Sequence, residues 1–233
     1  MHDGSVTPTP DPAAVSTTLL VDLDGTITDS FAGIAASFRH ALAEVGAPAP
    51  ADDVVVGIAG PPMIDTLRAI GLDPATADRA MAAYRERYTS VGWLENAVFD
   101  GMGGVLADLA ASGRRLAVAT SKNEATAIRI LEHFGLADHF EVIAGASDDG
   151  TRRRKWQVID SALERLGIAV DPETGTPEAP VVMIGDRSHD VEGAARFGIP
   201  AIVVGWGYAL DGEADAANWT VGNTAHLREV LDV

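Results

Sequence analysis

The sequence contains no cysteine, which excludes disulfide bonds, thiolate metal ligands and a thiol nucleophile. Basic residues are also scarce, since 17 Lys and Arg stand against 34 Asp and Glu and give a formal net charge of -17. Proteins bind nucleic acids and anionic membrane surfaces through clustered Lys and Arg. The charge balance therefore argues against both kinds of partner.

Long hydrophobic runs are missing too. No apolar segment approaches the ~18 residues that a membrane-spanning helix requires, and the first residues lack the basic start and apolar stretch of a secretory signal. We therefore expect a soluble protein of the cytoplasm. Residues 1–16 are rich in Pro, Thr, Ser and Asp, with almost nothing large to bury, so they are expected to form a flexible tail.

What is present is typical of a globular enzyme-sized chain: 233 residues, 47% of them hydrophobic and 22% charged. Short apolar runs rich in β-branched residues are found at 19–21, 116–119, 142–144, 181–184 and 202–204. Helical patterns at 101–112, 123–135, 155–167 and 188–198 follow or separate them. Strands that are apolar on both faces and alternate with helices predict an α/β fold with a doubly wound parallel sheet.

One segment interrupts the alternation. Residues 30–96 hold no convincing strand run, with 54–56 as a weak exception, and helical spacing of Ile34, Phe38 and Leu42 dominates. This pattern predicts a helical domain at 30–96, inserted into a core domain made of 17–29 and 97–233.

The strongest chemical signal is Asp22-Leu23-Asp24-Gly25-Thr26, directly after the first apolar run. Two carboxylates two residues apart in extended backbone point the same way, and they lie at the strand end where open α/β sheets bind ligands. Such a pair repels itself unless a cation or a shared proton intervenes, which indicates a metal or a raised pKa. The alternative is an ordinary Asp-Gly turn.

Two further signals follow the later strands. Thr120 ends the second run and precedes Ser121, Lys122 and a helix start, where hydroxyl and backbone donors can hold an anion, although this segment taken by itself favours a plain helix cap. Lys155 ends a run of basic residues and opens an amphipathic helix, which would fix its position relative to the sheet.

The last signal is Gly185-Asp186-Arg187-Ser188-His189-Asp190, after the run at 181–184. Asp186 lies at a strand end and Asp190 one helical turn later, so both carboxylates can face one point. Hard oxygen ligands gathered in this way suit Mg²⁺. His189 is expected to be a neighbour of the site, because no Ser nucleophile in a Gly-x-Ser-x-Gly turn accompanies it.

Taken in order, Asp-x-Asp-Gly-Thr, a strand-end Thr, a Lys and Gly-Asp-x-x-x-Asp resemble the four motifs of the haloacid dehalogenase (HAD) superfamily of phosphatases. The resemblance spans Asp22 to Asp190, and the helical insertion is similar to the cap of the phosphoglycolate phosphatase-like branch. It implies a Rossmann-like core with a helical cap and an Mg²⁺-dependent phosphoric monoester hydrolase. A small phosphorylated metabolite would be the substrate.

The same resemblance implies a role for each motif residue. Asp22 would be the nucleophile that forms an aspartyl-phosphate, and Asp24 the general acid and base. The implied substrate-binding residues are Thr120, Ser121, Lys122, Lys155 and Arg187, of which Thr120 and Lys155 also act in catalysis. The implied Mg²⁺ ligands are Asp22, the Asp24 carbonyl and Asp186, with Asp190 orienting that shell.

Other functions compete with this interpretation. A phosphomutase would use the same motifs. Stretches around 37–41, 117–122 and 142–147 also resemble an actinobacterial HAD-fold protein labelled a protein tyrosine kinase, yet the chain has no glycine-rich ATP loop, His-Arg-Asp or Asp-Phe-Gly, so a kinase would have to use Asp22. Three further alternatives are disfavoured. A metal-free dehalogenase of the same superfamily would not need a second acid at Asp24, and a receiver domain has no helical insertion after its first strand. A binding module with an inactive site is disfavoured because all four motif positions are filled.

Overall fold

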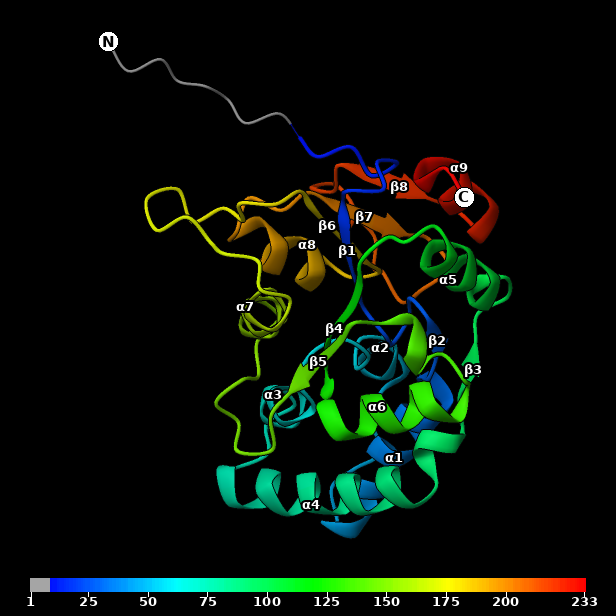
Figure 1. Cartoon of the computed structure of the whole chain (residues 1–233). Coiled ribbons are helices and arrows are strands. Elements are labelled where there is room, and N and C mark those ends of the chain that lie inside the picture. The colour runs from blue at the N-terminus through cyan, green and yellow to red at the C-terminus, as the bar shows by residue number, and fades with distance from the viewer. Residues whose placement is uncertain (1–8) are drawn as a thin grey trace.

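The structure, a computed structural model, describes residues 9–233 apart from the side chains of residues 52 and 53. Six strands form one parallel sheet in the order β5-β4-β1-β6-β7-β8 (Figure 1). They are β1 (Thr18–Val21), β4 (Leu116–Asn123), β5 (Val142–Ala146), β6 (Val181–Gly185), β7 (Ala201–Val204) and β8 (Trp219–Val221). The first five confirm the five predicted runs, whereas β8 is an addition.

Helices cover both faces of this sheet. Leu19 and Val21 of β1 pack into one hydrophobic cluster and Leu20 into the other, because successive side chains of a strand point to opposite faces. The first cluster includes residues of α5 (Met102–Ala111), α6 (Glu124–His133) and α9 (Thr224–Leu231). The second includes residues of α7 (Lys155–Arg165) and α8 (Ser188–Ala195). The predicted doubly wound α/β fold is confirmed.

The segment between β1 and β4 is mainly helical. It contains α1 (Phe31–Glu44), α2 (Asp52–Val56), α3 (Met63–Ala69), α4 (Pro74–Ser90) and the short 3-10 helix η1 (Gly92–Leu94), which we call the inserted helices. Figure 1 shows them gathered beyond one end of the sheet. Residues 54–56, the weak strand candidate, lie in α2, where Val55 packs into the core.

Two short strands join the inserted helices to the rest of the chain. β2 (Thr28–Asp29) and β3 (Ala97–Val98) pair antiparallel, with Thr28 opposite Val98. The chain therefore enters and leaves the inserted helices at neighbouring points.

The expected N-terminal tail differs from the structure where it is described. Residues 1–8 lie outside the described residues. Beyond them, the buried guanidinium of Arg114 donates to the carbonyls of Pro12 at 2.8 Å, Ala13 at 2.6 Å and Leu231 at 3.2 Å. A buried arginine requires acceptors. Because one guanidinium binds carbonyls of both segments, it holds residues 12 and 13 against the C-terminal helix.

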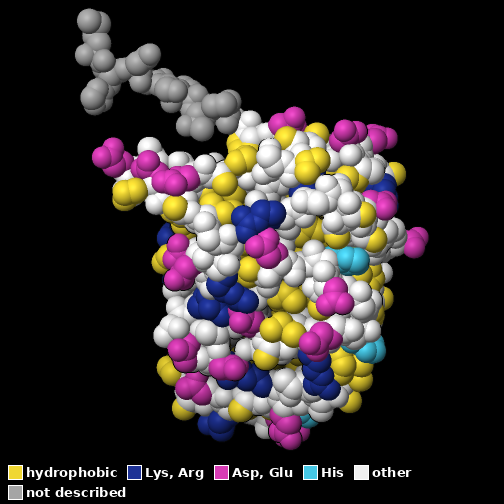
Figure 2. Space-filling view, viewed as in Figure 1, with side chains coloured by type: hydrophobic (Ala, Val, Ile, Leu, Met, Phe, Trp, Pro, Cys, Tyr) yellow, Lys and Arg dark blue, Asp and Glu magenta, His cyan; other side chains and the backbone are white. Residues whose placement is uncertain are grey.

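On the face drawn in Figure 2, Lys and Arg side chains are interspersed with Asp and Glu. Among residues 9–233, no helix combines the length and hydrophobicity that a membrane span requires.

Candidate active site

Polar residues converge at the carboxyl ends of three neighbouring strands. Asp22 follows β1, Thr120 lies in β4 and Asp186 follows β6, and β1 lies between β4 and β6 in the sheet. All three side chains are buried. The parallel sheet therefore brings residues from distant parts of the sequence to one place, at the sheet edge where ligands bind in open α/β folds.

The turn after β1 depends on Gly25. Its φ is 81°, in the left-handed region, and a Cβ at this position would overlap the Asp186 carboxylate. Glycine thus lets the turn at residues 22–26 approach the end of β6. An ordinary Asp-Gly turn does not require such a close approach.

Lys155, the first residue of α7, provides a buried ammonium group at this point. Its Nζ lies 2.9 Å from Asp22 Oδ1 and 2.6 Å from Asp190 Oδ1, and it donates to the Ala119 carbonyl at 2.9 Å. The apolar face of α7, including Val158, packs on the sheet and fixes the helix start. The predicted amphipathic helix thus holds the lysine beside two carboxylates.

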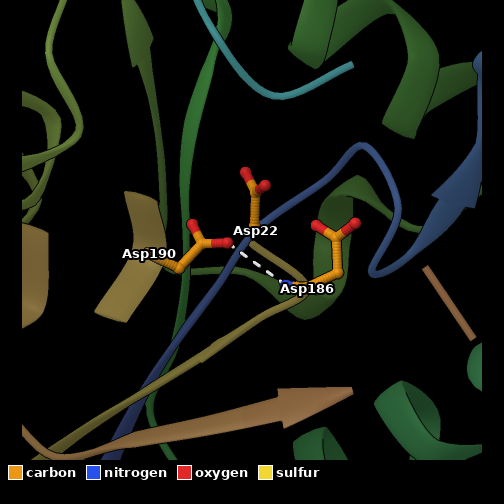
Figure 3. A group of neighbouring side chains, drawn as sticks. All are labelled: Asp22, Asp186 and Asp190. Atoms are coloured by element: carbon orange, nitrogen blue, oxygen red, sulfur yellow. Dashed lines mark hydrogen bonds between the residues drawn. The ribbon is translucent and has the colours of Figure 1, made fainter. Parts of the chain in front are cut away.

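Asp22, Asp186 and Asp190 form a cluster of buried carboxylates (Figure 3). Each offers an oxygen, and these atoms lie within 4.8 Å of one another. Asp190 Oδ2 accepts from the backbone N–H groups of Asp186 at 3.2 Å and Arg187 at 3.1 Å, which orients it. Asp186 Oδ2 accepts from the Tyr208 N–H at 2.7 Å, whereas the buried Asp186 Oδ1 has no hydrogen-bond partner among the residues that the structure describes.

The cluster is electrostatically strained. Burial, reinforced by the charges of Asp190 and Asp22, raises the pKa of Asp186 to about 8. Burial also raises the pKa of Asp22, against the opposing charge of Lys155. Burial alone would lower the pKa of Lys155, but Asp190 and Asp22 outweigh it and hold it above its ordinary value. One ammonium group thus faces three carboxylates, an arrangement that favours a further cation.

These donors fit a hard divalent cation. Carboxylate oxygens are the ligands that Mg²⁺ prefers, and Asp186 Oδ1 is a buried acceptor without a partner. Asp24 is not part of the cluster, so a metal contact from residue 24 would have to come from its backbone carbonyl, as the resemblance implies.

The Asp24 side chain has its own partners. Its Oδ1 accepts from the Ser30 hydroxyl at 2.5 Å, and its Oδ2 lies 2.7 Å from Lys122 Nζ. Two carboxylates only two residues apart therefore have different surroundings, with Asp22 beside Lys155 and Asp24 beside Lys122.

Thr120, Ser121 and Lys122 line a cavity that adjoins both aspartates. The Thr120 hydroxyl accepts from the Lys122 N–H at 3.2 Å. The Lys122 side chain is only 7% exposed, and its Nζ lies 4.6 Å from the ring centroid of Tyr88 on α4. Burial acts to lower the pKa of Lys122, but the negative charge of Asp24 raises it overall.

Arg187 is not brought to the other predicted substrate-binding residues. Its Nε donates to Glu213 Oε2 at 2.6 Å, and its Nη1 donates to the Ala59 carbonyl in the inserted segment. The buried guanidinium is engaged by these groups, so it joins the core to the inserted segment, and we assign it no phosphate contact.

Sequence reasoning gave no role to Ser30, Tyr88 or Tyr208. The Tyr208 hydroxyl accepts from the N–H groups of Ser30 at 2.8 Å and Phe31 at 3.1 Å, while its own N–H reaches Asp186. Tyr208 thus connects the start of the inserted segment to the carboxylate cluster. The sequence feature that could have indicated Tyr208 was Gly-Trp-Gly-Tyr, directly after β7.

Comparison with known proteins identifies the family of this chain. The family model for haloacid dehalogenase-like hydrolases matches residues 19–204. The chain is 52% identical to the tyrosine-protein kinase PtkA of Mycobacterium tuberculosis over 92% of this chain and 72% of that protein. It is 39% identical to a 5'-nucleotidase of Pseudomonas aeruginosa over 92% of this chain and 95% of that one.

A solved structure shares the fold. The crystal structure of a predicted phosphatase from Clostridium acetobutylicum has a TM-score of 0.84 and is 35% identical, and the match covers 94% of this chain and 100% of that one.

Proposed function

The chain belongs to the haloacid dehalogenase-like hydrolase family and is an enzyme related to phosphatases, and from this premise we propose that it is an Mg²⁺-dependent phosphatase that hydrolyses a small phosphate monoester through an aspartyl-phosphate on Asp22. The observation that carries the proposal is the pair Asp22 and Asp24, two carboxylates with separate cationic partners beside one cavity. A carboxylate that acts as a nucleophile and one that acts as a general acid and base need different electrostatic environments.

In the first step an Asp22 oxygen forms a bond to phosphorus while the bond from phosphorus to the ester oxygen breaks. Asp24 gives a proton to the departing alkoxide, and Lys155 offsets the negative charge beside Asp22. In the second step Asp24 takes a proton from water, whose oxygen bonds to phosphorus and releases Asp22 and inorganic phosphate. Thr120 supplies a hydroxyl donor next to this site.

Asp22, Asp186, Asp190 and the Asp24 carbonyl would hold or orient the metal. When bound there, Mg²⁺ would offset carboxylate and phosphoryl charge and so lower the repulsion between nucleophile and substrate. The unpartnered Asp186 Oδ1 supports this assignment.

We further propose that residues 30–96 act as a cap over the site. Three contacts support a closed position: Arg187 with the Ala59 carbonyl, Arg153 with Asp65 at 3.2 Å, and Lys122 over Tyr88. Closure would exclude water during the first step.

Asp186→Asn is expected to separate stability from metal binding. At neutral pH the metal-free variant should melt at a higher temperature than the parent, because burial and the neighbouring carboxylates raise the pKa of Asp186 to about 8, and the folding free energy lost in this way is absent for a neutral amide. Each kcal/mol gained raises Tm by about 2–4 °C in a chain of this size. Mg²⁺ should raise the Tm of the parent but not of the variant. Calorimetric melting with Mg²⁺ or EDTA measures both effects.

A matched control is Asp160→Asn, an exposed carboxylate on α7. It should leave the melting temperature and the Mg²⁺ response unchanged. An equal Mg²⁺ response in parent and Asp186→Asn would place the metal elsewhere.

Asp24→Asn is expected to lower kcat for alkyl phosphates by about 10²–10⁴-fold, the usual contribution of a general acid or base. With 4-nitrophenyl phosphate, whose leaving group needs little protonation, the phosphoenzyme should still form and then accumulate. Acid-quenched mass spectrometry would detect one added phosphoryl group. If the phosphoenzyme instead failed to form with both kinds of ester, Asp24 would not have the acid–base role.

The direct test of the proposed function is phosphate release from a panel of small phosphate monoesters with Mg²⁺ or EDTA. Release that requires Mg²⁺ supports it. No release from any ester by folded, Mg²⁺-loaded protein would overturn it.

A second candidate function is tyrosine phosphorylation, favoured by the 52% identity to a protein named for that activity. The two functions differ in the phosphoryl acceptor, which is water for a phosphatase and a tyrosine hydroxyl for a kinase. Incubation with ATP labelled in its terminal phosphate, followed by detection of labelled tyrosine, distinguishes them. Any such transfer should disappear in Asp22→Asn if it uses the same site.

A further inference from the structure

The cavity beside Asp22 and Asp24 has a volume of about 240 Å³ and extends between the sheet edge and the inserted helices. Its lining on the side of the inserted helices is mostly apolar or aromatic. The residues that matter most are Ile58, Met63, Ile64, Met81, Tyr84 and Tyr88. The phosphoryl site thus opens onto apolar side chains rather than onto a second polar site.

Charged groups around the cavity are unfavourable for a second anion. Among the described lining residues, Lys122 is paired with Asp24 at 2.7 Å and Arg153 with Asp65 at 3.2 Å. Arg85 is exposed, so water screens its charge. Asp148 adds a further acidic group to the lining. A carboxylate next to the phosphoryl group would therefore find no buried cation that is not already paired.

Two tyrosines on α4 give this cavity an aromatic wall. Tyr84 and Tyr88 are one helical turn apart, with ring centroids 5.6 Å apart and ring planes inclined by 9°. Burial raises the pKa of both phenols, so both stay neutral. The buried Tyr88 hydroxyl has no well-formed hydrogen bond among the described residues. Flat aromatic faces and edges preferentially pack against other rings.

We propose that this cavity binds an aromatic ring carried by the leaving group, so that the preferred substrates are phosphate monoesters of aromatic alcohols rather than of small hydroxy acids. The inference rests on the proposed function, because it places the ring next to the phosphoryl group at Asp22. The volume lies below the roughly 300–1,000 Å³ typical of ligand pockets. That size favours a single ring attached close to the ester oxygen over the base of a nucleotide, which a ribose holds further away.

The test compares benzyl phosphate with 2-phosphoglycolate, which both release a primary alcohol and so differ little in intrinsic reactivity. We expect kcat/KM to be at least about tenfold higher for benzyl phosphate, the discrimination that an apolar pocket commonly gives. Adenosine 5'-monophosphate forms the third arm. A higher kcat/KM for the nucleotide than for the benzyl ester would overturn the preference for a single ring and would show that the cavity binds the base of a nucleoside.

Tyr84→Leu keeps an apolar side chain but removes the ring, and it should reduce the preference for benzyl phosphate over 2-phosphoglycolate by several fold. Glu86→Ala is the matched control, because Glu86 is exposed on the same helix and does not line the cavity. That variant should keep the parent's preference. Equal or faster turnover of 2-phosphoglycolate by the parent protein would overturn the inference.

Binding to an inert analogue distinguishes this failure from failure of the proposed function. Benzylphosphonate and methylphosphonate share the phosphonate group and differ in the ring. Calorimetry should show tighter binding of benzylphosphonate to the parent and a smaller difference in Tyr84→Leu. If no ester is hydrolysed, the proposed function fails, and the phosphonates still decide whether the cavity binds a ring. Equal affinities for the two phosphonates would reject the aromatic site.

Discussion

Asp22→Asn is expected to reduce kcat by at least about 10³-fold, since loss of a nucleophile typically removes most of the rate enhancement. The substitution keeps the shape of the side chain but removes the charge that attacks phosphorus. It also relieves part of the repulsion among three buried carboxylates, so the variant should fold. The lost rate would therefore report on chemistry and not on unfolding.

Phosphate release and acid-quenched mass spectrometry measure this effect together. The parent protein should carry a phosphoryl group during turnover, and the variant should carry none. Asp160→Asn, on the exposed face of α7, should match the parent in both measurements. If Asp22→Asn retained more than a tenth of the activity, or still became phosphorylated, the nucleophile would have to be another residue.

Lys155→Met is expected to lower both stability and activity. The Lys155 ammonium lies 2.9 Å from Asp22 and 2.6 Å from Asp190, and its removal leaves these buried carboxylates without a cation. Breaking a buried ion pair in this way costs about 3–5 kcal/mol. At about 2–4 °C per kcal/mol, the metal-free protein should melt roughly 6–20 °C lower. Loss of charge stabilisation beside the nucleophile should also reduce kcat by about 10²–10³-fold.

A double variant separates these two effects. Lys155→Met combined with Asp190→Asn should recover much of the lost melting temperature, because one uncompensated charge is removed together with its partner. Activity should not recover, since no ammonium group remains beside Asp22. Recovery of kcat in the double variant would show that Lys155 acts only on stability.

The polar residues at strand ends could be found from sequence because the strands are short, continuous and apolar. Leu19–Val21 and 181–184 are buried on both faces of the sheet, so the position of the next polar residue indicates a sheet edge. Asp22 and Asp186 follow these runs directly. Their convergence then follows from parallel strand order, which the alternation of strands and helices predicts.

Elements at the margin of the fold had weaker signals. β8 has only three residues, with Thr220 exposed and Trp219 partly exposed, since it lies at the end of the sheet. An edge strand needs no continuous apolar run, so the pattern that identified the other strands was missing. Residues 54–56 show the opposite case: three valines favour a strand locally, but packing among the inserted helices decides for α2.

The sequence by itself determined the fold class and the chemical groups at the sheet edge, because both depend on local periodicity and on residue type. Only the tertiary structure decided which charges pair. It sets Lys122 against Asp24, directs Arg187 to Glu213 and the Ala59 carbonyl, and connects Tyr208 to Asp186. These contacts join residues far apart in sequence, through the long side chains of Lys122 and Arg187 and through the backbone N–H group of Tyr208. Their partners depend on how strand ends, loops and helices come together in three dimensions, and no local pattern records that packing.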